Sequence, residues 1–281
     1  MAIDLVTKYA PYVDELFSQE SKKSILTNND FSFNGASKVK LYKITTAEMS
    51  DYGRTGAGVG NWSRYGAIKN LDATTEDATL TKDRSFTFVI DKLDENQTGG
   101  QLSGATALAR QLREVTIPEV DAYTYGIMAA GAGFKPAAVT LTADNIYDEI
   151  TNASAELDDA MVPEEGRCLI VTPKVYRLMK KSKEIVMQTE IGADMRKKGV
   201  IANLDGAAVI KIASARLPKN FGFMMSHFSA CCAPTQLADY RTHEDPPGIS
   251  GTLVEGRMVY DAYVFENKAK GIYYQENKAA E

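Results

Sequence analysis

Cysteine, histidine and tryptophan are scarce in this chain of 281 residues, which contains three, two and one of them respectively. Cys168 stands alone and Cys231 and Cys232 are adjacent, so they predict no disulfide framework but reduced thiols that fill apolar space in a cytoplasmic protein. A zinc site needs about four convergent nitrogen or sulfur ligands, usually with a Cys-x-x-Cys pair. His227 and His243 have no such partners, and we expect neither a bound metal nor another cofactor.

Long apolar runs and an excess of basic residues are also missing. No run approaches the roughly 20 residues of a membrane-spanning helix, and charges such as Asp4, Lys8 and Asp14 interrupt the N-terminal stretch where a signal peptide would be apolar. We therefore expect no membrane segment. The formal charge of −5 gives no support to a dedicated nucleic-acid binder, although it is compatible with a protein that encloses DNA without gripping it.

Residues 30–98 contain little that would form a core. At both ends of this segment apolar and polar residues alternate as in strands, over 38–41 and 85–91. Between them, residues 52–65 carry four glycines and almost nothing apolar. A lone hairpin is marginal in water, so another chain must supply the missing contacts, and the segment predicts an assembly subunit. The candidate subunit-interface residues are Tyr52, Val59, Trp62 and Tyr65.

Helical periodicity begins after the glycine pair at 99–100. Apolar residues at helical spacing predict one long helix over 101–129, and Pro118 is expected to kink it because proline lacks an amide hydrogen. A short strand is predicted over 134–141. A second helix is predicted over 142–161, capped by Thr142 or Asp144. Its apolar stripe is Ile146, Ile150, Ala153, Leu157 and Met161.

The pattern after the second helix indicates a compact α/β unit over about 141–220. Residues 168–171 are all apolar, which is typical of a strand covered on both faces. Thr172 and Pro173 then start a helix that continues to Lys181. A turn at 203–206 leads into a strand over 207–213. Beyond Pro218 the chain changes to short strands and turns.

Signatures of catalysis are incomplete. Glycines 56, 58 and 60 alternate as in a phosphate-binding loop, but neither a buried strand nor a helix flanks them. Residues 248–252 do not form the Gly-x-Ser-x-Gly turn of a hydrolase. The carboxylates of the 142–161 helix lie opposite its apolar stripe and make a solvated face. We expect no enzymatic activity.

Residues 174–198 hold eight basic residues against three acidic ones. Such a run could contact DNA through its phosphates. A solvated helix face, or charge pairing between copies of the chain, is the interpretation we favour, because charge runs are usually surface features.

Taken in order, these elements resemble those of tailed-phage major capsid proteins with the HK97-like fold. Three local phrases also resemble those of such coat proteins, namely residues 82–88 running to Asp91 and Asp94-Glu95, residues 162–173, and residues 256–261. None is a catalytic signature, so the specificity lies in their joint order over nearly the whole chain.

The resemblance implies an α+β fold with five parts. They are an N-terminal arm (1–32), an extended hairpin called the E-loop (33–98), a spine helix with the first part of a peripheral domain (99–140), an inserted axial α/β domain (141–220) and peripheral-domain strands (221–281). In the family, some relatives begin with a long charged segment that a protease removes. Here the ribbon begins near residue 33, so we expect a separate scaffolding protein or an unprocessed start.

The implied function is that of a coat protein of a tailed bacteriophage or prophage. Copies would assemble in the bacterial host cytoplasm into the pentamers and hexamers of an icosahedral shell around double-stranded DNA. The implied partners are the chain itself, a scaffolding protein, a portal protein, possible decoration proteins and the packaged DNA by non-specific contact. An encapsulin-like nanocompartment shell is the nearest alternative, and a soluble α/β enzyme built on 141–220 is a less favoured one.

Overall fold

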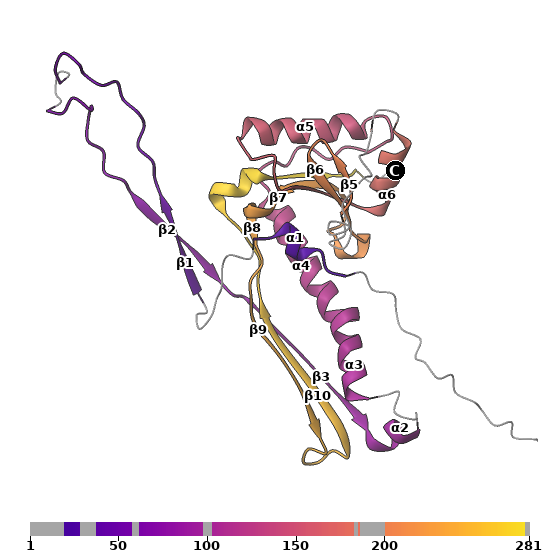
Figure 1. The fold of residues 1–281 in the computed structure, drawn as a ribbon. Coiled ribbons are helices and arrows are strands. Elements are labelled where there is room, and N and C mark those ends of the chain that lie inside the picture. The colour runs from indigo at the N-terminus through magenta and orange to yellow at the C-terminus, as the bar shows by residue number, and fades with distance from the viewer. Residues whose placement is uncertain are drawn as a thin grey trace, which may run out of the picture. The chain divides into compact units, whose positions relative to one another are not determined.

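The computed structural model describes residues 20–28, 38–57, 62–97, 103–182, 185 and 200–278, so most of the predicted N-terminal arm lies outside the described residues. The chain divides into two compact units (Figure 1). We call Phe33–Leu80 the hairpin unit, and Met1–Ser32 with Thr81–Glu281 the main unit. Among the described residues, no helix is both long and apolar enough to cross a membrane.

A five-stranded sheet forms the centre of the main unit. Its strands, in spatial order, are β12 (Ile272–Glu276), β7 (Phe221–His227), β4 (Arg167–Val171), β6 (Ala207–Lys211) and β5 (Val200–Leu204). β4 runs parallel to β6 and antiparallel to β7. Every residue of β4 is buried, which confirms the strand predicted to be covered on both faces.

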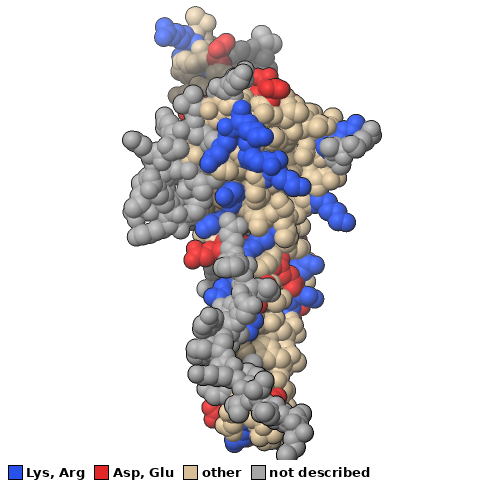
Figure 2. Space-filling view, turned by 90° about the vertical axis from the view of Figure 1, so that its right-hand side faces the viewer, with Lys and Arg blue, Asp and Glu red and all other residues tan. Residues whose placement is uncertain are grey.

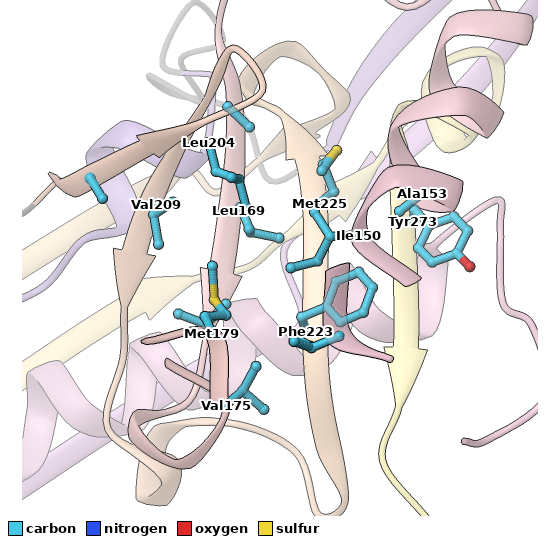
Figure 3. Packing of buried hydrophobic residues seen from close by; sticks show 14 of the residues in the cluster. Ile150, Ala153, Leu169, Val175, Met179, Leu204, Val209, Phe223, Met225 and Tyr273 are labelled. Atoms are coloured by element: carbon cyan, nitrogen blue, oxygen red, sulfur yellow. The ribbon is translucent and has the colours of Figure 1, made fainter. Parts of the chain in front are cut away.

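Helices cover both faces of this sheet. Ile170 of β4 belongs to one apolar cluster with Tyr125 and Met128 of α4 (Ile117–Gly131). The preceding residue, Leu169, belongs to a second cluster with α5 (Ile146–Asp159) and α6 (Pro173–Lys181) (Figure 3). Successive side chains of a strand point to opposite faces, so one short run of apolar residues serves both clusters.

The α5 helix confirms most of its predicted stripe, since Ile146, Ile150, Ala153 and Leu157 are all fully buried. Met161 was predicted wrongly. The helix ends at Asp159, and Met161 takes a left-handed backbone conformation with φ 56° that leaves its side chain exposed. The N-cap position is held by Asn145, between the end of the preceding loop and the helix. Of the two predicted caps, Thr142 does make capping bonds: its hydroxyl oxygen accepts from the Asn145 amide at 3.3 Å, and its amide donates to the Asn145 side-chain oxygen at 2.7 Å. The start of α6 is confirmed: the Thr172 hydroxyl oxygen accepts a hydrogen bond from the Val175 amide at 3.2 Å.

The long predicted helix is present over three consecutive helical segments, α3 (Gly104–Gln111), a π-helical turn (Leu112–Thr116) and α4. The disturbance expected at Pro118 takes the form of this π-helical turn just before it. The Ile117 amide bonds to the carbonyl of Leu112, five residues back. A wider turn at this point relieves the clash between a proline ring and the carbonyl four residues before it.

A three-stranded antiparallel sheet lies in the main unit, with the order β3 (Lys82–Asp91), β10 (Gly251–Tyr260) and β9 (Thr235–Glu244). β3 pairs with β10 along its whole length. The strand predicted over 85–91 is therefore real, but the expectation of one hairpin over 33–98 needs correction, because 81–98 belong to the main unit. The apolar alternation of β3 has a physical reason, since Phe86 stacks against Tyr240 of β9.

Two further expectations differ from the structure. The unit predicted over 141–220 supplies three strands of the central sheet, and β7 and β12, from the region predicted as peripheral strands, complete it. Residues 134–141 do not form a strand. They make isolated bridges from Phe134 to Tyr273 and from Val139 to Asn277, with Pro136, which has no amide hydrogen to donate, between them.

Candidate assembly surface

The hairpin unit is held together by a ladder and by polar contacts beyond it. β1 (Lys38–Ile44) pairs antiparallel with β2 (Ala73–Thr79) over seven residues each. The Thr45 amide then donates to the Asp72 carbonyl at 3.0 Å. Further out, Lys69 forms an ion pair with Glu48 at 3.1 Å. These contacts align the two strands of the hairpin, and none of its described residues belongs to either apolar cluster.

Two glycines shape the outer part of the hairpin. The Gly53 amide donates to the Arg64 carbonyl at 2.9 Å, and a Cβ on Gly53 would collide with the Gly56 carbonyl oxygen. Gly66 has φ 90°, a conformation that residues with side chains rarely adopt. The Ser50 hydroxyl donates to the neighbouring carbonyl of Tyr65 at 2.7 Å. The glycines therefore serve close backbone contacts within the hairpin.

Of the four predicted interface residues, the structure brings two together. The rings of Tyr52 and Tyr65 pack edge to face with centroids 5.0 Å apart. Tyr52 is 50% exposed, Tyr65 78% and Trp62 82%. Val59 lies outside the described residues. We call Tyr52, Trp62 and Tyr65 the aromatic tip; its exposure is typical of surfaces that bind another protein.

Sequence reasoning missed a second set of exposed apolar side chains on the same unit. Periodicity alone could not reveal them, because they lie outside the Gly-rich stretch and show no single spacing. They are Tyr42, Ile44, Met49, Ile68 and Leu71. Together with the aromatic tip, they give the hairpin unit considerable apolar area that is exposed to solvent in the single chain.

The main unit fixes the chain firmly just after the hairpin unit. Asp261 is only 3% exposed, and one of its carboxylate oxygens accepts hydrogen bonds from both the amide and the hydroxyl of Thr81, each at 2.7 Å. The other oxygen accepts from the Tyr123 hydroxyl at 2.8 Å and the Ala262 amide at 2.7 Å. Burial raises the pKa of Asp261, but the hydrogen bonds from Thr81, Tyr123 and Ala262 outweigh it and hold the pKa below its ordinary value.

Replacing this carboxylate, as Asp261→Asn, is expected to destabilise unassembled subunits by about 1–3 kcal/mol at neutral pH, because an amide cannot accept all four bonds. A lowered folded-state pKa contributes stability above the unfolded-state pKa, and this contribution is lost as the pH falls through the folded-state value. The difference in unfolding free energy between the two proteins should therefore shrink toward about pH 3. Urea unfolding at both pH values measures it. Asp159→Asn, at an exposed carboxylate, is the control, and a difference independent of pH would contradict the assignment.

The three cysteines are buried and the His227 ring is fully hydrogen-bonded, so these residues have structural roles. All three cysteines are buried free thiols, as expected for apolar filler. Burial raises the pKa of Cys168 to about 11 and that of Cys231 to about 12, so both stay protonated and weakly nucleophilic at neutral pH. Both ring nitrogens of His227 are engaged, by the Ser229 hydroxyl at 2.8 Å and the Glu165 carbonyl at 2.9 Å. In the described part of the chain, no cluster of side chains could hold a metal ion.

No protein-family model matches the sequence, and no curated protein matches it. Solved structures do match its fold. A chain from Mycobacterium phage Che8 superposes with a TM-score of 0.74 and 19% identity, and the match covers 97% of each chain. The capsid of cyanophage P-SCSP1u gives 0.73 at 12% identity, over 99% of this chain and 94% of that one.

A virus-like particle from Pyrococcus furiosus is less similar, with a TM-score of 0.57 and 13% identity over 92% of each chain. The structures from phage Che8 and cyanophage P-SCSP1u thus match this chain better than the particle does, over almost its full length. They confirm the resemblance drawn from the sequence at the level of the fold. The chain has the α+β fold of phage capsid proteins.

Proposed function

We propose that this protein is the major capsid protein of a tailed phage or prophage. Its copies form the pentamers and hexamers of an icosahedral shell that encloses double-stranded DNA. The observation that carries the proposal is the aromatic tip, a set of exposed rings on a unit whose described residues belong to neither apolar cluster. Because Trp62 and Tyr65 are mostly solvent-exposed in the single chain, they are suited to burial against another copy.

In the proposed shell, the hairpin unit acts as the E-loop of the HK97-like fold and lies across a neighbouring copy. The helices α3 and α4 act as the spine, and the sheet with α5 and α6 as the axial domain. Assembly takes place in the host cytoplasm with a separate scaffolding protein, and the finished shell takes a portal protein and possible decoration proteins. Contact with the packaged DNA is non-specific, in keeping with the net charge of −5.

The two alternatives receive less support. The particle from Pyrococcus furiosus is a weaker structural match than the phage capsids, so an encapsulin-like shell is not favoured. The matching structures are phage and shell structures, which suggests a non-enzymatic role. Size-exclusion chromatography and electron microscopy of the purified chain, alone and with its scaffolding protein, test the proposal. Monomers that never assemble under either condition would contradict it.

The aromatic tip allows a finer test. The double substitution Trp62→Ser and Tyr65→Ser should leave the thermal unfolding of single subunits unchanged, because both side chains are mostly exposed to solvent. Buried aromatic anchors at interfaces contribute about 2 kcal/mol or more each. Losing even one such contribution weakens association roughly thirty-fold. Light scattering against protein concentration measures the loss.

The matched control is Met161→Ser, which removes another highly exposed apolar side chain, on the main unit. It should assemble like the unaltered chain. Equal assembly by the control and the double variant would rule out the aromatic tip as an anchor.

A further inference from the structure

The α6 helix carries a basic surface. Its four basic residues are all exposed, and the helix has no acidic residue. Lys174, Arg177 and Lys181 follow a spacing of three and four, which places them along one side of the helix. Figure 2 looks onto the side where α6 lies in Figure 1 and shows Lys and Arg gathered in its upper part, with few acidic side chains among them. Among the described residues, none forms an ion pair with Lys174, Arg177, Lys180 or Lys181.

The α5 helix carries the opposite charge. It holds five acidic residues and no lysine or arginine. Asp158 pairs with the buried Arg167 at 2.7 Å, while the other four have no ion pair within the described ranges. Glu156 and Asp159 lie in the last turn of the helix, where the helix dipole disfavours negative charge. Helix stability therefore does not explain their presence.

These two helices lie on the same face of the central sheet. Both contribute to the apolar cluster around Leu169 and Phe223 (Figure 3). The two helices also contact each other. Yet in the described part of the chain no ion pair joins α5 to α6. Each copy thus presents an acidic helix beside a basic helix, and most of the charge on both has no ionic partner among the residues that the structure describes.

We propose that α6 of one copy docks against α5 of the next. This pairing rests on the proposed function, because it requires that copies assemble. It uses two different surfaces of each chain, which is the heterologous kind of contact that closes into a ring when repeated. The lengths are compatible, since α5 spans about 20 Å and α6 about 13 Å at 1.5 Å per residue.

A second copy is a better partner for α6 than nucleic acid. A phosphate backbone that approached α6 would meet the acidic side chains of α5 on the same face of the sheet. A second copy instead offers opposite charge to both helices at once, its α5 to α6 and its α6 to α5. Exposed ion pairs contribute only about 0–1 kcal/mol each, so the pairing would fix register and speed association more than it would add affinity.

Charge reversal on one helix and then on both tests the pairing. The first variant carries Lys174→Glu, Arg177→Glu and Lys181→Glu, and the second carries Asp148→Lys, Glu156→Lys and Asp159→Lys. Each alone brings like charges together, so oligomer formation at low salt should fall at least ten-fold. The chain that carries both sets restores complementarity and should assemble nearly as well as the unaltered protein.

The matched control reverses three exposed lysines elsewhere, as Lys219→Glu, Lys270→Glu and Lys278→Glu, and should assemble normally. Native mass spectrometry measures the oligomers, circular dichroism checks the fold, and retention of duplex DNA is measured alongside. Glutamine at the three α6 positions replaces glutamate if that variant misfolds, with a smaller loss expected.

Normal assembly by the α6 variant would overturn the pairing, and so would failure of the doubly reversed chain to recover while it stays folded. Normal shells that have lost DNA would assign α6 to phosphate contact instead, which also overturns it. If the unaltered chain forms no oligomer, the proposed function fails together with the pairing. Failure of the pairing alone is recognised by unaltered chains that do assemble.

Discussion

A chain that lacks residues 51–66 should fold and yet form no shells. The deletion removes the aromatic tip, while β1 pairs with β2 and β3 pairs with β10 outside the deleted segment. The remaining ends are easily joined, because Ser50 lies within hydrogen-bond distance of the Tyr65 carbonyl. An Asn-Gly turn closes the shortened hairpin, since this pair favours tight two-residue turns.

We expect the thermal unfolding of the deleted chain to match that of the unaltered subunit, and electron microscopy to find no shells. A second chain, in which an equally long Gly-Ser linker replaces residues 51–66, separates the length of the hairpin from its side chains. If the linker chain forms shells, assembly requires only the length of the hairpin and not its side chains. Shells from the deleted chain would show that the hairpin unit is not the strap between copies.

Local periodicity predicted the elements whose apolar pattern is continuous along the chain. The stripe from Ile146 to Leu157 and the strand ending at Val171 are examples, since a buried helix face and a doubly covered strand each leave a direct mark on the sequence. Fold class was predictable for the same reason, and the order of these elements carried the resemblance to capsid proteins.

Strand pairing was the part that the sequence did not reveal. β2 has the sequence ATTEDAT, which shows no apolar alternation, so the return strand of the hairpin was assigned instead to 85–91. Whether β1 pairs with β2 or with the 85–91 strand depends on contacts between residues far apart in the chain. β3 found its partner in β10, more than 150 residues later, where Gly256 lies opposite Phe86 and leaves room for its ring.

The candidate interface was predicted only in part for a similar reason. Aromatic residues in a polar, Gly-rich stretch are conspicuous, and Trp62 and Tyr65 were found in this way. Ile44 and Leu71 gave no comparable signal, because the sequence around them does not show which face of the hairpin lacks cover. The sequence showed an acidic helix over 142–161 and a basic run from residue 174, but not that the two helices are neighbours, since their adjacency follows from packing on one sheet face.

The buried ion pair between Arg216 and Asp121 should be the most sensitive point of the main unit. The Arg216 guanidinium donates to the Asp121 carboxylate at 2.8 Å, and the two side chains are 7% and 2% exposed. The Ser21 hydroxyl donates to the other carboxylate oxygen at 2.6 Å. The pair thus joins α4 to the segment after β6 and to the N-terminal segment.

Arg216→Met should therefore destabilise unassembled subunits by about 3–5 kcal/mol, because it removes the guanidinium that pairs with the buried Asp121 carboxylate and leaves only the Coulombic attraction of Lys23. Adding Asp121→Leu removes that charge, and the double variant should recover much of the loss, since a well-packed apolar pair can match a buried ion pair. Guanidinium unfolding of both single variants and the double variant gives the coupling energy directly. If Arg216→Met costs less than about 1 kcal/mol, as expected for an exposed pair, the Arg216–Asp121 pair is not buried from water in solution.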